Sequence, residues 1–256
     1  MVSADPVGII DSGVGGLSVL CELKKLLPNE QYMYLADTEN APYGVKSAPE
    51  ILRLTENNAE VLLKRNCKAI VLACNTATAV AVEHLRERYS DIPIIGLEPA
   101  LAPAIREHQD ENILVIATKA TLKMERFKSL ISSFSEHRDK IFCEETQKIV
   151  SFVEGDMNYR AGLIEYLKKR FEKYKALKFG ACVLGCTHFP FAKKEIEAAL
   201  GYRVAFYDGG KGAARRLEYL LSKNGLINQS EGEKSVIWLA GGFEEKAVRI
   251  LNDCII

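Results

Sequence analysis

Short apolar runs alternate along the chain with longer segments in which apolar residues recur every three or four positions. The short runs are rich in β-branched residues and indicate buried strands, whereas the longer segments have the period of amphipathic helices. This alternation is typical of an α/β fold with mostly parallel sheets flanked by helices. The pattern predicts strands at 6–10, 32–36, 69–73, 92–97, 112–117, 181–185, 203–207 and 235–239, and helices at 15–27, 49–65, 77–89, 159–174 and 213–224.

Two of the strand ends resemble each other. One apolar strand runs into Cys74 and a second runs into Cys186, and small polar residues follow each cysteine. An earlier pair of strand ends, at 9–12 and 115–118, precedes the two cysteines in the same order and at similar spacing. The repeat predicts two similarly built domains.

Pro and Gly residues punctuate the chain between these halves. We interpret 98–103 as one crossing between domains and 208–210 as the return. The first domain is then 1–97 plus 208–256, and the second is 98–207. Because ligands of open α/β sheets bind where strands end and helices begin, we expect the active site in the cleft between the domains.

Composition narrows the class of protein. The 256 residues are 48% hydrophobic and 27% charged, which is typical of a globular chain. Lys and Arg number 34, as do Asp and Glu, and they are scattered, so no nucleic acid partner is expected. No secretory leader and no apolar run of roughly 18 residues is present, which predicts a cytoplasmic protein without membrane contact. Seven cysteines without a dense disulfide spacing fit a reducing compartment.

Cys74 and Cys186 are the candidate catalytic residues. Inverting a stereocentre by proton transfer needs a base on one face and an acid on the other, and a pair of cysteines supplies both. A free thiol has a pKa of about 8.5, which a helix N-terminus lowers, and each of these cysteines precedes a predicted helix start. No lysine stands beside a convincing phosphate cup, so no cofactor is predicted. The other five cysteines are expected to be small buried residues.

Polar neighbours accompany both thiols. Asp11, which follows the first strand, is expected to orient a substrate ammonium or to tune proton transfer. The loop that it opens, 11–16, does not read G-x-G-x-x-G and lacks the ending of a P-loop. His188 lies two residues after Cys186, where it can polarise that thiol or relay its proton. The side chains of Asn75, Thr76 and Thr187 either hold substrate carboxylate and ammonium groups or cap helices.

A zinc site is the alternative use of the same residues. It would take Cys74, Cys186 and His188 as ligands, but the sequence offers neither a C-x-x-C pair nor an evident fourth ligand. No metal is therefore predicted.

With four motifs in family order over nearly the whole chain, the sequence resembles the glutamate racemases, which belong to a group of amino-acid racemases that use two cysteines and no cofactor. The Gly-Cys-Thr-His run at 185–188 favours glutamate over the related aspartate racemases. The resemblance implies two domains with one catalytic cysteine each, a homodimer, and interconversion of L- and D-glutamate, which supplies D-glutamate for peptidoglycan in a bacterium. The motifs are 10–16, 36–44, 73–77 and 184–190, and the implied substrate-binding residues are Asp11, Ser12, Pro42, Tyr43, Gly44, Asn75, Thr76, Thr187 and His188.

The chain departs from that family pattern between residues 143 and 156. Family members often carry Cys-Pro and Pro-Leu-Val-Glu here, and only the ending Val153-Glu154 survives. Glu154 is either an acid that assists His188 or the substrate ammonium, or a solvated carboxylate at a helix end. An aspartate racemase, a non-catalytic relative that binds an amino acid, and a thiol redox protein are the other functions that the sequence leaves open.

Overall fold

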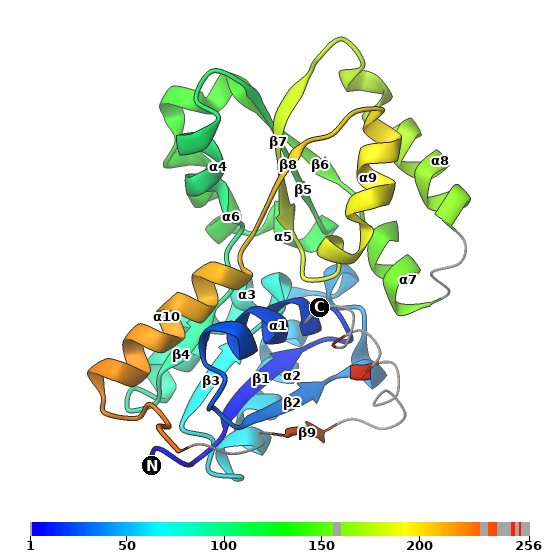
Figure 1. Ribbon diagram of the computed structural model, residues 1–256. Coiled ribbons are helices and arrows are strands. Elements are labelled where there is room, and N and C mark those ends of the chain that lie inside the picture. Colours follow the sequence, from blue (N-terminus) through cyan, green and yellow to red (C-terminus); the bar gives the residue numbers. More distant parts are fainter. Residues whose placement is uncertain (1, 156–159, 231–234, 240–246, 249–250, 252–256) are drawn as a thin grey trace.

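The computed structural model describes residues 2–155, 160–230, 235–239, 247–248 and 251. It has two lobes, and each contains a parallel sheet (Figure 1). The strand order is β4-β3-β1-β2-β9 in the first lobe and β6-β5-β7-β8 in the second. This confirms the predicted α/β class with two parallel sheets flanked by helices. The strands are β1 (Val7–Asp11), β2 (Tyr32–Ala36), β3 (Ala69–Leu72), β4 (Ile94–Gly96), β5 (Asn112–Ala117), β6 (Ile141–Glu145), β7 (Phe179–Gly185), β8 (Ala205–Asp208) and β9 (Val236–Leu239).

In the first lobe, helices cover both faces of the sheet. Every residue of β1, β2 and β3 is buried, which explains why these strands are continuous apolar runs in the sequence. Successive residues point to opposite faces, so Ile9 packs in the core beneath α1 and α10, and Ile10 packs beneath α2 and α3. These helices are α1 (Leu17–Leu26), α2 (Ala48–Leu63), α3 (Asn75–Arg88) and α10 (Gly210–Lys223).

The second lobe has the same layered plan. Ile113 and Val115 pack against α4 and α6, while Leu114 and Ile116 pack against α7, α8 and α9 on the other face. In this lobe, the short helix α5 follows β5, and the 3-10 turn η5 follows β7. The remaining helices and 3-10 turns of the two lobes are α4 (Leu101–Glu107), α5 (Lys119–Lys123), α6 (Glu125–Ser132), α7 (Lys148–Glu154), α8 (Arg160–Phe171), α9 (Lys193–Leu200), η1 (Thr38–Asn40), η2 (Tyr43–Val45), η3 (Ser135–Lys140), η4 (Glu172–Tyr174) and η5 (Phe189–Ala192).

Several details differ from the sequence prediction, and two of them concern the second sheet and the candidate site. Strand β6 was not predicted, because it carries Glu144 and Glu145. Glu144 is nevertheless buried, since Arg170 and Lys173 of the α8 region pair with its carboxylate. The expectation that both cysteines precede helix starts is right for Cys74, but Cys186 precedes the short turn η5.

The chain crosses from the first lobe to the second after β4 and returns after β8. Asp208 still pairs with Leu184 in the second sheet, so the return begins at Gly209. Beyond it, α10 packs against α1, and β9 pairs with β2 at the edge of the first sheet. These contacts support the division that we propose, 1–97 with 208–256 and 98–207, except that Asp208 itself still belongs to the second sheet.

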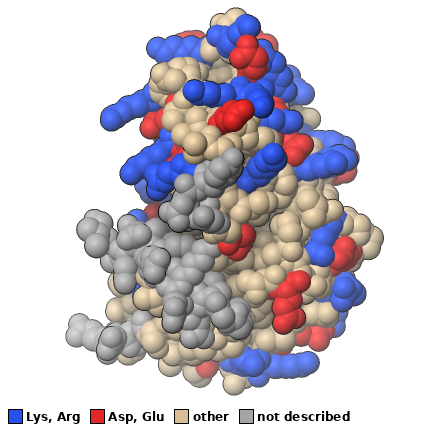
Figure 2. Space-filling model, turned by 90° about the vertical axis from the view of Figure 1, so that its right-hand side faces the viewer, with Lys and Arg blue, Asp and Glu red and all other residues tan. Residues whose placement is uncertain are grey.

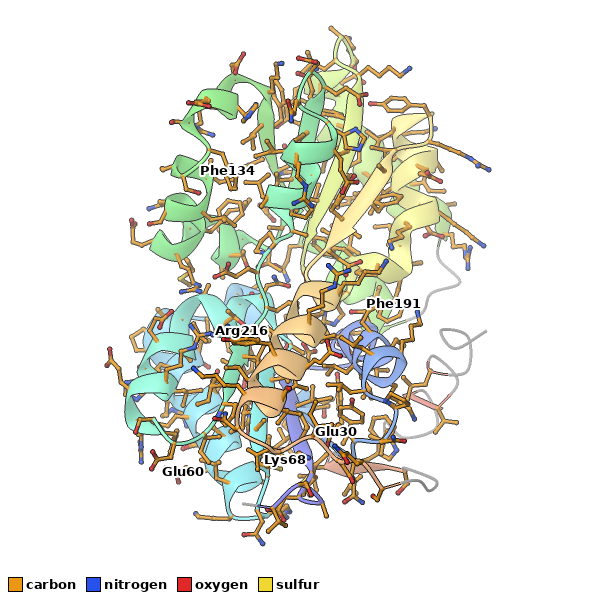
Figure 3. All side chains as sticks on the ribbon, turned by 60° about the vertical axis from the view of Figure 1, so that its left-hand side comes forward. Glu30, Glu60, Lys68, Phe134, Phe191 and Arg216 are labelled. Carbon is orange, nitrogen blue, oxygen red and sulfur yellow. The ribbon has the colours of Figure 1, made fainter. Side chains whose placement is uncertain are left out.

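A buried ion pair anchors the returning segment to the first lobe. Lys68 Nζ lies 2.6 Å from Glu30 Oε2, and both side chains are almost completely buried (Figure 3). Lys68 also donates hydrogen bonds to the carbonyl oxygens of Ser3 and Leu226, at 2.8 Å for Leu226. The backbone N–H of Asn228 donates to Glu30 at 2.8 Å. Four segments that are distant in the sequence therefore meet at one pair of charges.

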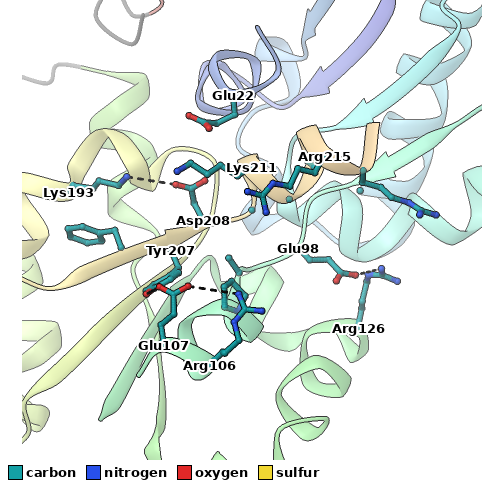
Figure 4. A pocket seen from close by; sticks show the side chains of 18 of the residues that line it. Glu22, Glu98, Arg106, Glu107, Arg126, Lys193, Tyr207, Asp208, Lys211 and Arg215 are labelled. Carbon is teal, nitrogen blue, oxygen red and sulfur yellow. Dashed lines mark hydrogen bonds and ion pairs between the residues drawn. The ribbon is translucent and has the colours of Figure 1, made fainter. Parts of the chain in front are cut away.

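The two crossings border a cavity of about 920 Å³ (Figure 4). Its walls carry ion pairs, including Lys193 with Asp208 at 3.8 Å and Arg126 with Glu98. Arg126 also reaches Glu83 of α3 at 2.7 Å, so it bridges the lobes on this side. The residues that line the cavity include neither of the candidate cysteines.

The surface shows charges of both signs. On the face in Figure 2, Lys and Arg side chains lie on both lobes, interspersed with Asp, Glu and uncharged residues. Among the helices that the structure describes, none is both long and apolar enough to cross a membrane.

Candidate active site

Cys74 and Cys186 lie at the carboxyl ends of β3 and β7, where the two lobes face each other. Cys74 is the residue immediately before α3, and Ser12 Oγ lies 3.9 Å from its sulfur. Both cysteine side chains are buried, at 7% and 8% exposure. Of the remaining cysteines, Cys21, Cys67 and Cys182 are buried and Cys143 is half-buried, whereas Cys254 lies outside the described residues.

The environment of Cys74 favours the neutral thiol. Burial and the negative charge of Asp11 raise its pKa to about 12. The backbone N–H of Ala77 and the Ser12 hydroxyl oppose this shift, while the charge of Cys186 adds to it. Because the charge of Cys186 affects the pKa of Cys74, the two thiols are close enough to interact electrostatically. At neutral pH, Cys74 therefore carries its proton.

Cys186 has a cationic neighbour. Its sulfur lies 3.5 Å from Nδ1 of His188, and the other ring nitrogen lies 2.5 Å from Glu154 Oε1. Burial alone would lower the pKa of His188, but the hydrogen bonds with Cys186 and Glu154 and the charges of Cys186 and Asp11 outweigh it and raise the pKa to about 10. These contacts favour the protonated imidazole, which can donate from both nitrogens.

Asp11 connects the two sides of the site. Its carboxylate accepts hydrogen bonds from Gly13 N at 2.9 Å and from the hydroxyl of Thr187 at 3.2 Å. Burial raises its pKa to about 6, although His188 and the backbone N–H groups act in the opposite direction. Asp11 comes from the same lobe as Cys74, and Thr187 from the same lobe as Cys186, so this hydrogen bond joins the two sides.

The glycine-rich loop that follows β1 contacts residues of the second lobe. Glu154 accepts a hydrogen bond from Val14 N at 2.9 Å, and a side chain at Gly13 would place its Cβ 1.9 Å from the same carboxylate oxygen. A Cβ at Gly15 would lie 2.4 Å from Nδ1 of His188. The absence of side chains therefore allows two residues of the second lobe to approach this backbone closely. Glu154 contacts His188 and the loop, as one of its two sequence interpretations requires.

Tyr43 and Gly44 form part of η2, which Pro42 precedes. The hydroxyl of Tyr43 donates to Asp37 at 2.5 Å, and the side-chain amide of Asn58 lies 3.2 Å from both partners. The Tyr43 side chain is buried and its hydroxyl is occupied by this network, which fixes the position of the η2 backbone.

Threonines from both lobes meet beside η2. Thr76 at the start of α3 lies 3.2 Å, oxygen to oxygen, from Thr118 and from Thr121 of the second lobe, and those two lie 2.9 Å apart. Asn75 is 4% exposed, and neither polar atom of its amide has a hydrogen-bond partner. Neither Thr118 nor Thr121 was predicted from the sequence as a site residue. Thr118 did stand at a strand end of the repeat, which was the available signal.

The polar groups of the candidate site are neutral donors, carboxylates and one cation. Apart from His188, the polar groups described above are hydroxyls, amides, carboxylates and backbone N–H groups. Among the described residues, no group of three or more His, Cys, Asp or Glu side chains is arranged to hold a metal ion. Such an arrangement suits a small substrate with both carboxylate and ammonium groups, with two thiols available for proton transfer.

Comparison with known proteins places the chain in a family. The family model described as Asp/Glu/Hydantoin racemase matches residues 19–217. A glutamate racemase from Clostridium botulinum is 42% identical over 250 residues, which cover 98% of this chain and 96% of that protein.

Two solved structures have the same fold. A glutamate racemase isoform from Bacillus anthracis superposes with a TM-score of 0.86 at 28% identity, covering 98% of this chain and 95% of the other. The glutamate racemase from Francisella tularensis in complex with D-glutamate gives a TM-score of 0.79 at 27% identity, with the same coverage. The chain therefore belongs to the Asp/Glu/hydantoin racemase family, and it is an amino-acid racemase, an isomerase.

Proposed function

We propose that this enzyme interconverts L- and D-glutamate by proton transfer between the substrate α-carbon and two cysteines. The observation that carries the proposal is the pair of buried strand-end thiols in unlike surroundings, Cys74 beside Asp11 and Cys186 beside the protonated His188. The choice of glutamate is supported by the relatives named glutamate racemase and by the Francisella structure with D-glutamate.

We propose the starting protonation state from these unlike surroundings. The imidazolium of His188 lies 3.5 Å from the sulfur of Cys186 and can stabilise a thiolate there, while Cys74 keeps its proton. The Cys186 thiolate takes the α-proton of one enantiomer and becomes a thiol. The electron pair left on the α-carbon then takes the proton of Cys74 on the opposite face, which leaves Cys74 as the thiolate. The other enantiomer reacts in the reverse direction.

The residues around the thiols would hold the substrate. Asp11, with its pKa of about 6, is ionised at neutral pH and suits the α-ammonium group. Ser12, Asn75, Thr76 and Thr187 offer neutral donors to the carboxylates. Glu154 would keep His188 charged and oriented through its 2.5 Å contact with Nε2.

Exchange of the α-hydrogen tests the proposal directly. The protein is incubated in deuterated water with L-glutamate and, separately, with D-glutamate, without added PLP or metal. We expect deuterium to enter the α-position and optical rotation to decay to zero. Folded protein that does neither with either enantiomer would refute the proposal.

Single thiol substitutions test the two-base mechanism. Cys74→Ser and Cys186→Ser should each nearly abolish racemisation, because each removes the acid or base on one face. Cys74→Ser retains the Cys186 thiolate, so it should still exchange the α-hydrogen of one enantiomer. Racemisation at the wild-type rate in either variant would exclude the mechanism. Cys182→Ser, which alters a buried thiol of the β7 core, is the matched control for the chemical change.

The cellular setting belongs to the same proposal. We propose that the enzyme is a cytoplasmic homodimer and that its product, D-glutamate, is used in the synthesis of peptidoglycan. The bacterial origin of the relatives supports the first part. Growth of a bacterial strain that requires D-glutamate, rescued by this gene, tests the role, and sedimentation equilibrium tests the dimer.

A further inference from the structure

Gln147 presents a buried amide with no hydrogen-bond partner where the two lobes meet. It is the last residue before α7 in the second lobe, and neither Oε1 nor Nε2 has a partner, although both atoms are shielded from solvent. Across the boundary lies Gly44 of the first lobe. A Cβ on Gly44 would be 2.7 Å from Oε1 of Gln147 and 3.1 Å from its Nε2, so the amide rests against the bare glycine backbone.

This amide belongs to the surroundings of the candidate substrate site. The same Cβ on Gly44 would lie 3.0 Å from Cβ of Thr118, whose hydroxyl joins the cross-lobe contact with Thr76. Thr76 lies two residues after the catalytic candidate Cys74. The polar groups thus extend from the thiol, through the threonines, to Gln147. Gln147 stands at the end of this series that is remote from the sulfur.

A buried amide without a partner is unfavourable unless a ligand supplies one. Glutamate carries its second carboxylate two methylene groups beyond the carbon at which protons are exchanged. With its α-carbon between the thiols, that carboxylate would extend away from Cys74 toward the remote end of the polar series. There, an amide N–H is a suitable donor to a carboxylate.

We propose that Gln147 donates a hydrogen bond to the side-chain carboxylate of the substrate and thereby helps to select glutamate. The proposal rests on the proposed glutamate racemase function. It concerns binding of a group that does not react, so its loss should weaken substrate binding more than it slows the proton transfer.

Two substitutions separate recognition from packing. Gln147→Leu keeps the volume and removes the donor. Gln147→Glu keeps the shape but places a negative charge against the substrate carboxylate. Gln109→Leu is the matched control, because Gln109 is an exposed residue of the same lobe whose amide donates to the carbonyl of Arg106. KM and kcat are measured from α-deuterium exchange, with glutamate and with glutamine as substrates.

For Gln147→Leu, we expect KM for glutamate to rise about 10- to 100-fold with kcat changed about threefold or less, the range for losing one hydrogen bond to a charged group. Gln147→Glu should raise this KM further. The ratio of glutamine to glutamate exchange should also increase in Gln147→Glu, because its carboxylate can accept a hydrogen bond from the glutamine amide. Gln109→Leu should behave as wild type.

The inference is overturned if both Gln147 variants keep the wild-type KM for glutamate. It is also overturned if the two variants lower kcat equally for glutamate and glutamine without a change in their ratio, since Gln147 would then only support the contact between the lobes. If Gln147→Leu does not fold, the isosteric Gln147→Glu decides alone. A wild-type protein that exchanges neither enantiomer of glutamate refutes the proposed function instead.

Discussion

The contact between the glycine-rich loop and Glu154 can be broken by a single methyl group. In Gly13→Ala, the new Cβ would lie 1.9 Å from Oε1 of Glu154, and ordinary contact begins near 3.4 Å, so the carboxylate must withdraw by about 1.5 Å. Gly13 is not among the positive-φ residues of the described chain, so alanine fits the backbone itself. The substitution therefore acts on the contact and not on the loop conformation.

The withdrawal removes two interactions of one oxygen atom. Oε1 of Glu154 lies 2.9 Å from Val14 N and 2.5 Å from Nε2 of His188, and neither distance survives a shift of this size. Hydrogen bonds to charged groups contribute about 1.5–3 kcal/mol each, and coupled losses are not additive, so we expect a cost of about 3 kcal/mol. If this cost falls on the closed catalytic state, kcat/KM for racemisation drops about a hundredfold.

A double-mutant cycle tests whether the methyl group acts through Glu154. Steady-state kcat/KM is measured for the wild type, Gly13→Ala, Glu154→Ala and the double variant. Because Glu154→Ala removes the atom that clashes, Gly13→Ala should cost almost nothing further in that background. Equal losses in both backgrounds would refute the reasoning. Gly212→Ala is the control, since a Cβ at that position would have no neighbour within 4 Å.

Two further predictions concern stability. Lys68→Met leaves the buried Glu30 carboxylate without its countercharge and should lower the free energy of unfolding in urea by about 3–5 kcal/mol. Lys64→Met, which removes one partner of an exposed ion pair, should barely change this free energy. Similar losses in both variants would contradict the prediction. Burial raises the pKa of Asp11 from 3.8 to about 6 on folding, so its contribution to stability is complete below the unfolded value and is lost as the pH rises through the folded one. Between about pH 4 and 6, the free energy of unfolding of the wild type should therefore fall relative to that of Asp11→Asn, and parallel curves would contradict the assignment.

The sequence could predict those parts of the molecule that depend on local pattern. The strands at 32–36 and 112–117 match the structure because each is a continuous apolar run with both faces covered. Cys74 could be recognised for a similar reason, since a buried strand ends just before it and a helix starts just after it. The roles assigned to Cys74 and Cys186 remain predictions that the exchange experiments test.

Features that depend on contacts between the lobes could not be predicted in this way. The partners of Thr118 and Thr121 come from the other lobe, and no spacing in the sequence encodes that approach. Strand β6 was missed because Glu144 reads as a surface residue until Arg170 is seen to pair with it. The turn η5 separates Cys186 from the regular helix α9, and the apolar pattern of the sequence does not reveal this interruption.

Burial of the two thiols has a consequence for how the enzyme must work. Both cysteine side chains are almost completely buried, so we expect a substrate to reach them when the lobes separate. Separation must break the hydrogen bond from Val14 to Glu154 and the one from Ser18 Oγ to the carbonyl of Thr187, each 2.9 Å long. The bond from Glu154 to His188 lies within the second lobe and can persist. We therefore expect His188 to keep its charge when the lobes separate, and Asp11 to lose its hydrogen bond from Thr187 until they close around the substrate.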